Sequence, residues 1–170
     1  MNTVHQETLD AINAATAGMD EQQLLYHPEG KWSSAQILEH LALAFGGTCK
    51  MMKRALEADK GLGDTPSIKQ RMQAFLVTGV GYFPEGRQAP KMVEPKGEWG
   101  GMESLEKIRN NLIAMDKLHS ECLTKVGTHG WLGNHPVLGP LTIHQWPRFH
   151  RVHTRHHMKQ VRERKLAQQK

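Results

Sequence analysis

The 170-residue sequence contains only two cysteines, Cys49 and Cys122, and it has no long apolar run. Two cysteines outside a CxxC pair exclude a disulfide framework and a thiolate zinc site, so we expect buried thiols. A membrane helix needs about 18 to 20 apolar residues in succession. The N-terminal segment also carries acidic residues where a signal peptide carries positive charge and an apolar stretch. These absences favour a cytoplasmic protein without a membrane partner.

Internal repeats and low-complexity tracts are also absent, and acidic residues are scarce near the C-terminus. The hydrophobic content of 38% excludes a disordered chain, and the length fits one domain over residues 1–170. Residues 148–170 hold eight Lys or Arg against one acid, Glu163. This segment could indicate a nucleic-acid partner, but cations are favoured near a helix C-terminus and no nucleic-acid-binding motif is present. We therefore expect no nucleic-acid partner.

The apolar residues present favour helices, since Leu and Met outnumber the β-branched Val and Ile. Apolar positions recur at helical spacing in four segments, and no strand-like alternation is evident. The expected helices cover residues 3–18, 33–59 and 102–125, and a last helix that starts near residue 142. Capping-box patterns, Ser33 with Gln36 and Thr142 with Gln145, mark two of the starts. Four such helices predict an all-α four-helix bundle.

The connection between the second and third helices, residues 60–100, is unusually long. Three prolines between residues 84 and 95 favour an extended course there, because proline lacks an N–H donor. A short helix is expected earlier in the connection, with Thr65 as N-cap and Pro66 in its first turn. Some forty residues can cross the whole length of a bundle. The second and third helices can then run parallel, which predicts up-down-down-up order.

Histidine is abundant, with 11 copies, and three of them are candidates for a metal site. His153 and His157 are four residues apart, about 6 Å of helix rise, so both imidazoles can lean toward one point. This is the two-ligand geometry of helical zinc motifs. His40 lies on the inward stripe of the second helix. A buried imidazole nitrogen without a partner costs about 1 to 3 kcal/mol, so a shared divalent ion explains why several histidines face inward.

Two further inward histidines leave alternatives open. His150 lies about 60° from His153 around the helix, so it can replace His153 as a ligand or lie outside the first shell of ligands. His119, on the third helix, can be a fourth ligand, a base, or a core histidine bonded to a backbone carbonyl. His156 is rotated away and is expected at the surface. The remaining histidines are expected to be ordinary surface residues: His5, His27, His129, His135 and His144.

Small residues occupy the face of the second helix that carries His40. A glycine inside a helix costs about 1 kcal/mol relative to alanine. Gly47 nevertheless lies in the middle of this helix, and Ala44 lies on the same face. The small side chains can leave space beside His40 for a bound molecule. They are equally consistent with close helix packing or a kink.

Three stretches of the sequence resemble motifs of a known family: KWSSAQILEHLALAF, HPVLGPLTIHQWPRF and HTRHHMKQV. The first is similar to a Trp-Ser pair followed by a histidine, and the last is similar to a closing HxxxHxxQ pattern. Together they resemble the DinB/YfiT-like superfamily of metal-binding four-helix bundles. The resemblance implies His40, His153 and His157 as ligands, in agreement with the helical spacing. It also implies Gln160 as a neighbour of the ligands.

The same resemblance implies several functions. Some members are thiol S-transferases or thiol-dependent isomerases that use bacillithiol, mycothiol or glutathione, and others are described only as candidate metal-dependent hydrolases. We therefore expect zinc or nickel that activates a small thiol or water toward a small-molecule substrate, with His119 or His150 as proton shuttles. The alternative is a stress-related binding or scaffold protein that performs no chemistry. Dimers are common among relatives, which allows for a homodimer.

Overall fold

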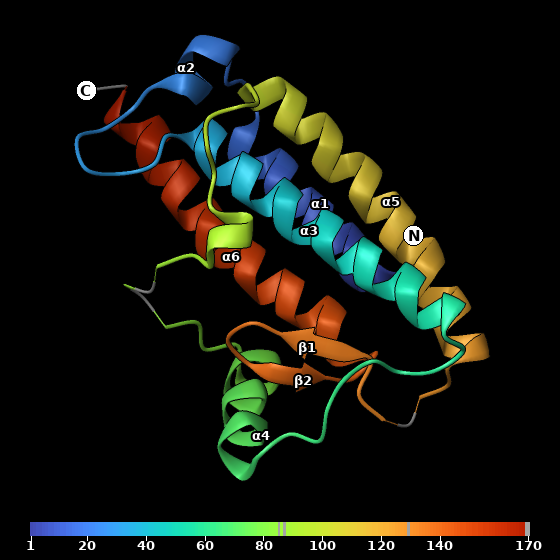
Figure 1. Ribbon diagram of the computed structural model, residues 1–170. Coiled ribbons are helices and arrows are strands. Elements are labelled where there is room, and N and C mark those ends of the chain that lie inside the picture. Colours follow the sequence, from blue (N-terminus) through green and yellow to red (C-terminus); the bar gives the residue numbers. More distant parts are fainter. Residues whose placement is uncertain (85, 87, 129, 169–170) are drawn as a thin grey trace.

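The computed structural model describes residues 1–84, 86, 88–128 and 130–168, and it is mostly helical (Figure 1). Four long helices lie side by side: α1 Thr3–Thr16, α3 Ser34–Glu57, α5 Gly101–Lys125 and α6 Gln145–Ala167. α3 packs along α5, α1 packs along α6, and α3 also contacts α6. No described helix is long and apolar enough to cross a membrane. The helical fold class predicted from the sequence is therefore confirmed.

Both predicted capping boxes form. The Ser33 N–H donates to Gln36 Oε1 over 2.9 Å, and the Gln36 N–H donates to Ser33 Oγ over 3.1 Å. Thr142 and Gln145 exchange the same pair of hydrogen bonds. The regular helix nevertheless begins only at Gln145, after a short turn. Pro147 consequently falls in the first turn of α6, where its missing N–H leaves no helical carbonyl without a donor.

Three short elements escape the sequence reasoning. The five-residue helix α2, Glu21–Leu25, begins at a capping box formed by Asp20 and Gln23. Strands β1, Gly133–His135, and β2, Gly139–Leu141, pair antiparallel in a hairpin before α6. The expectation of a chain without strands is therefore wrong for this segment. Each strand has only three residues and includes glycine, so no alternating pattern can develop in the sequence.

The long connection from α3 to α5 runs along one side of the bundle (Figure 1). It contains α4 Ile68–Phe75, the π-helical turn η1 Leu76–Val80 and the 3₁₀ turn η2 Lys91–Val93. The N-cap of α4 is Ser67, so the prediction of Thr65 as the cap is wrong. Ser67 and Gln70 form a capping box that supplies partners to two backbone N–H groups, which Thr65 does not.

The core is built from apolar side chains of all four long helices. Full burial of one large apolar side chain stabilises the fold by about 1.5 to 3 kcal/mol. Its largest fully buried members include Ile12, Phe45, Leu112, Met115 and Met158. Cys49 and Cys122 are buried, as expected, and their thiols donate to backbone carbonyls of Asn111 and Met52. Burial raises the pKa of each thiol to about 11. The chain's own sulfurs therefore stay protonated and are poor nucleophiles.

A candidate metal centre

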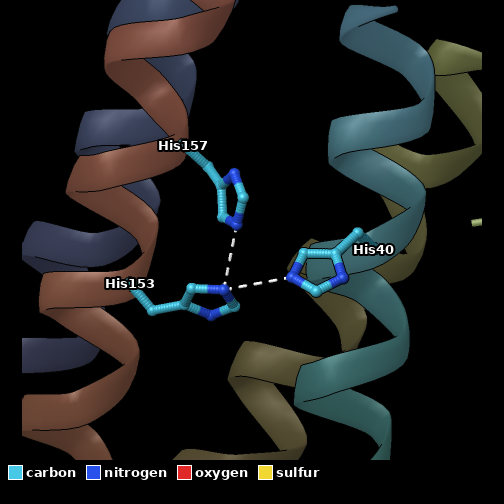
Figure 2. Close-up of side chains that lie close together, drawn as sticks. All are labelled: His40, His153 and His157. Atoms are coloured by element: carbon cyan, nitrogen blue, oxygen red, sulfur yellow. Dashed lines mark hydrogen bonds between the residues drawn. The ribbon is translucent and has the colours of Figure 1, made fainter. Parts of the chain in front are cut away.

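The three histidines predicted as ligands lie together between α3 and α6. His40 comes from the second turn of α3, and His153 and His157 lie one turn apart on α6 (Figure 2). His153 Nε2 lies 3.0 Å from His40 Nε2 and 3.0 Å from His157 Nε2. All three side chains are buried, and each offers one nitrogen to a shared point. This cluster, His40, His153 and His157, is called the histidine triad below.

Hydrogen bonds to the outer nitrogens fix the tautomers of two of these rings. His40 Nδ1 lies 2.7 Å from the Val93 carbonyl oxygen, and His157 Nδ1 lies 2.8 Å from Gln160 Oε1. Since both oxygens only accept, each Nδ1 carries the proton and each Nε2 presents a lone pair. His153 Nε2 therefore faces two lone pairs and can donate to only one of them. A cation at the shared point could accept the lone pairs that this arrangement leaves without a donor.

Burial keeps these imidazoles neutral. Burial lowers the pKa of His40, and it lowers the pKa of His153 well below the ordinary value, with the neighbouring His157 and His40 adding to the effect. For His157, burial and then His40 lower the pKa to about 3. Metal ions bind the neutral form of imidazole. The triad is therefore in the ligating state throughout the neutral range.

The triad fits a divalent transition metal by three further observations. Zinc–nitrogen bonds of about 2.0 to 2.1 Å place two tetrahedral ligand nitrogens about 3.4 Å apart, close to the 3.0 Å spacings of the triad. The two outer hydrogen bonds, from His40 and from His157, are of the kind that orients metal-bound imidazoles. The third ring, His153, differs from the other two, because its buried Nδ1 finds no partner among the described residues. Three imidazoles also leave coordination positions open for water or substrate.

Glu39 holds the segment that supplies the Val93 carbonyl. Its buried carboxylate accepts hydrogen bonds from three successive backbone N–H groups, those of Lys96, Gly97 and Glu98, over 3.2, 2.8 and 3.3 Å. Gly97 adopts a φ of 71°, which favours glycine, so the chain can turn around the carboxylate. The end of the long connection is thereby pinned to α3 beside His40. Sequence reasoning did not identify Glu39, whose only signal is an acid on a buried helix face.

Aromatic side chains enclose the triad. The Phe83 ring stacks on His153 at 5.2 Å between centroids, and Phe149 stacks on the same imidazole at 5.2 Å. Trp32 packs on His40 at 5.4 Å. Rings on several sides restrict the directions in which the imidazoles can turn. They also give any ligand that reaches the triad an apolar surface to contact.

The triad opens into a cavity of about 2180 Å³ that contains the predicted small residues. Ala44 and Gly47 both line this cavity, and a Cβ atom added at Gly47 would meet no atom within 4 Å. Gly47 is therefore beside open space and not at a tight helix contact. At Gly46, by contrast, an added Cβ would lie 3.4 Å from Asn111 on α5. Both adjacent glycines line the cavity, but only Gly46 also lies close to a neighbouring helix.

His150 and His119 occupy different environments. His150 is fully buried in the cavity wall, and its Nε2 lies 2.9 Å from Thr48 Oγ1. His119 lies away from the triad, where its Nε2 donates to the Ile143 carbonyl over 3.2 Å and its ring packs on His5. That arrangement matches the core-histidine alternative for His119. Of these two histidines, His150 borders the cavity and His119 does not.

The structure corrects the expectation of surface positions for two histidines. His5 is completely buried, and its Nδ1 lies 3.0 Å from Asp116 on α5. His135 is half-buried in the hairpin, where its Nδ1 accepts hydrogen bonds from two backbone N–H groups of the turn. His5 is covered because α1 presents it to α5, a contact that the short helical pattern around it does not reveal.

The other expectations for surface histidines are met in part. His27 and His144 are exposed. His156 is only half-buried, because its ring lies against Phe83 at 4.9 Å. The expectation for His129 falls outside the described residues.

A mostly helical fold that gathers three buried imidazoles around one point defines a protein able to hold a metal ion. Residues 5–161 match the family model of the DinB superfamily, and the chain belongs to that superfamily. Comparisons with curated proteins and with solved structures return no match.

Proposed function

We propose that this protein is a metalloenzyme in which His40, His153 and His157 hold zinc or nickel, and in which a small thiol or water acts as the nucleophile. The observation that carries the proposal is the convergence of three Nε2 atoms, together with the hydrogen bonds by which Val93 and Gln160 hold the Nδ1 atoms of His40 and His157. When bound, the ion lowers the pKa of a thiol or water beside it. The proposal includes a single helical domain with up-down-down-up order, supported by the length of the α3–α5 connection.

In this proposal, the chain's own residues orient the ligating imidazoles and leave room for the substrate. Phe83 and Phe149 confine the His153 ring, and Gln160 fixes the orientation of His157. Ala44 and Gly47 leave room for a substrate next to His40. In the thiol reaction, sulfur bonds to an electrophilic carbon while the leaving group departs with the bonding electrons. In the water reaction, oxygen adds to an acyl carbon and the leaving group departs after taking up a proton.

His150 is the residue proposed to move the proton released by the nucleophile. It is buried in the wall of the cavity, its pKa is lowered well below the ordinary value by burial, and its Nδ1 has no partner among the described residues. Such a ring has a free nitrogen to accept or pass a proton. His119 is not assigned this role in the proposal, because its Nε2 bonds to a backbone carbonyl.

The first experiment measures the metal content of protein purified without a nickel column. We expect close to one equivalent of zinc or nickel in the wild type and a large loss in the His157→Ala variant. His119→Ala is the matched control, since that histidine lies outside the triad. A wild-type protein with no transition metal after incubation with zinc and nickel would overturn the proposal.

A second experiment separates the two nucleophiles. Metal-loaded protein is incubated with chlorodinitrobenzene and a panel of low-molecular-weight thiols, and separately with activated esters without thiol. Thiol-dependent turnover that is abolished in His157→Ala supports a transferase, and ester hydrolysis without thiol supports a hydrolase. Inactivity in both assays, with metal retained, supports the alternative of a non-catalytic binding protein.

A further inference from the structure

Arg164 continues the inward stripe of α6 beyond the triad. It lies seven residues after His157, two helical turns or about 10 Å along the axis. Unlike the exposed Arg162 on the same helix, it is only 7% exposed. Arg164, Gln160 and the triad line the same cavity. A buried guanidinium therefore borders the same space as the candidate metal centre.

The protein provides Arg164 with little negative charge. Its Nε donates to the Trp32 carbonyl over 3.2 Å, and its Nη1 lies 3.5 Å from the Gln160 carbonyl. Among the described residues, the carboxylate paired with it is that of Glu163 at 3.6 Å, on a side chain that is 53% exposed. Nη2 makes no hydrogen bond within the part of the chain that the structure describes. A buried cation is costly unless it is well paired, and the Glu163 carboxylate, on a half-exposed side chain, lies near Nη1 only. Two parallel N–H groups of a guanidinium match an oxyanion.

The charge of the cavity lining favours the same kind of ligand. Among the described residues that line the cavity, seven are Lys or Arg and two are Glu. The two acidic residues are Glu94 and Glu163. A concave surface lined mainly by one sign of charge raises the local concentration of oppositely charged molecules. Anions are therefore drawn into the cavity that Arg164 borders.

We propose that Arg164 forms an oxyanion-binding subsite of this cavity, which takes a carboxylate or phosphate group of the substrate. This proposal adds a substrate class to the proposed function. It rests on that function for the statement that the other end of the substrate reacts at the triad. A substrate bound in this way carries its anionic group at a distance from the group that reacts at the triad, since the two sites lie two helical turns apart along α6. Its apolar part lies against the Trp32 and Phe83 side chains, which also line the cavity.

The test follows the arginine Nε–Hε signals of ¹⁵N-labelled, zinc-loaded protein by nuclear magnetic resonance. Inorganic phosphate and succinate are titrated separately at constant ionic strength, so that the two sources of the oxyanion are compared. We expect the Arg164 signal, assigned from its loss in Arg164→Lys, to shift in a saturable way with at least one of the two. A linear or absent shift with both anions would overturn the proposal.

The matched control is Arg162→Gln, which removes one charge from an exposed position of the same helix. We expect the dissociation constant of the anion to rise at least tenfold in Arg164→Gln and to stay within twofold in Arg162→Gln. Equal weakening in both variants would show only general charge attraction and would contradict the subsite. Arg164 also anchors the Trp32 backbone, so circular dichroism checks the fold. If Arg164→Gln does not fold, the test relies on the saturable shift of the wild-type Arg164 signal and on the anion affinity of Arg164→Lys.

Repeating the titration with His157→Ala separates this inference from the proposed function. The anion is held by Arg164 and not by the triad, so we expect saturable binding to persist in that variant after its metal is lost. A wild-type protein that binds no transition metal but still binds the anion in a saturable way would count against the metalloenzyme alone. Metal retained without saturable anion binding would count against the subsite alone.

Discussion

At the scale of single residues, the site depends on which nitrogen of each imidazole carries the proton. Val93 and Gln160 place the protons of His40 and His157 on Nδ1, away from the shared point. Without such acceptors, a neutral imidazole could turn or change tautomer, and its Nε2 lone pair would not face the other rings. The outer hydrogen bonds therefore prepare the triad before any ligand arrives.

Replacing Gln160 with alanine tests this preparation. The variant removes the oxygen that accepts from His157 Nδ1, so we expect zinc affinity to fall about 10- to 100-fold while the helix is retained. Affinity is measured by competition with a zinc-binding dye. Gln6→Ala, which removes a glutamine that bonds to Asp10 on the surface of α1, should leave the affinity unchanged. Equal affinities in wild type and Gln160→Ala would contradict the positioning role.

The triad could be predicted from the sequence because helical spacing fixes which residues share a face. His153 and His157 follow from the four-residue interval, and His40 follows from its apolar neighbours. The role of Val93 could not be predicted, because its backbone carbonyl accepts the hydrogen bond from His40 and any residue at that position offers the same carbonyl. Arg164 also lies on the inward stripe, but its burial could not be predicted. A basic residue near a helix C-terminus is equally consistent with a solvated charge that complements the helix dipole.

At the scale of elements, the long connection after α3 contributes the Val93 carbonyl to the site, and Glu39 on α3 holds the connection in place. The three backbone donors of residues 96–98 converge on this one carboxylate, which replaces the water that a loop would otherwise bind. Sequence periodicity says nothing about such a loop, since the information lies in one buried acid and one glycine with positive φ. This is why only the length, the short helix and the extended course of the connection could be predicted.

Glu39→Ala should loosen this connection. The change leaves three backbone N–H groups without their charged acceptor, so we expect the free energy of unfolding to fall by about 2 to 3 kcal/mol. Urea denaturation measures the loss, and faster amide hydrogen exchange at Gly97 and Glu98 locates it. Glu57→Ala, at the exposed end of α3, is the matched control and should change stability by less than about 0.5 kcal/mol. Unchanged exchange at residues 96–98 would contradict the pinning role.

The hairpin before α6 should be sensitive to acid through His135. Its Nδ1 accepts from the Val137 and Leu138 N–H groups, and burial lowers its pKa from 6.5 to about 4. The folded pKa lies below the unfolded one, so the stabilisation is complete above about pH 6.5 and declines as the pH falls toward 4. Asparagine can accept from the same turn without titrating.

We therefore expect His135→Asn to lose less stability than the wild type between pH 7 and pH 4. Urea denaturation at a series of pH values gives the difference in free energy of unfolding between the two proteins. That difference should change in favour of the variant as the pH falls and should level off below about pH 4. A difference that stays constant across the range would mean that His135 does not titrate as its surroundings indicate.

At the scale of the whole molecule, the triad joins two packed pairs of helices. α3 packs along α5 and α6 packs along α1, while His40 comes from the first pair and His153 and His157 come from the second. Contacts between α3 and α6 include this cluster of neutral rings, which contributes less packing than an apolar seam of the same size. An ion bound there links the two pairs and binds the folded state only.

Zinc should therefore raise the thermal stability of the entire bundle. Free zinc at about 100 times its dissociation constant adds about 2.7 kcal/mol, which for a chain of this size corresponds to a rise in Tm of about 5 to 10 °C. The rise should disappear in His153→Ala, because this imidazole lies within 3.0 Å of both other rings. His119→Ala should keep the full rise even where its own Tm is lower, because His119 bonds to the Ile143 carbonyl away from the triad. A zinc-dependent rise of equal size in His153→Ala would place the stabilising ion elsewhere in the molecule.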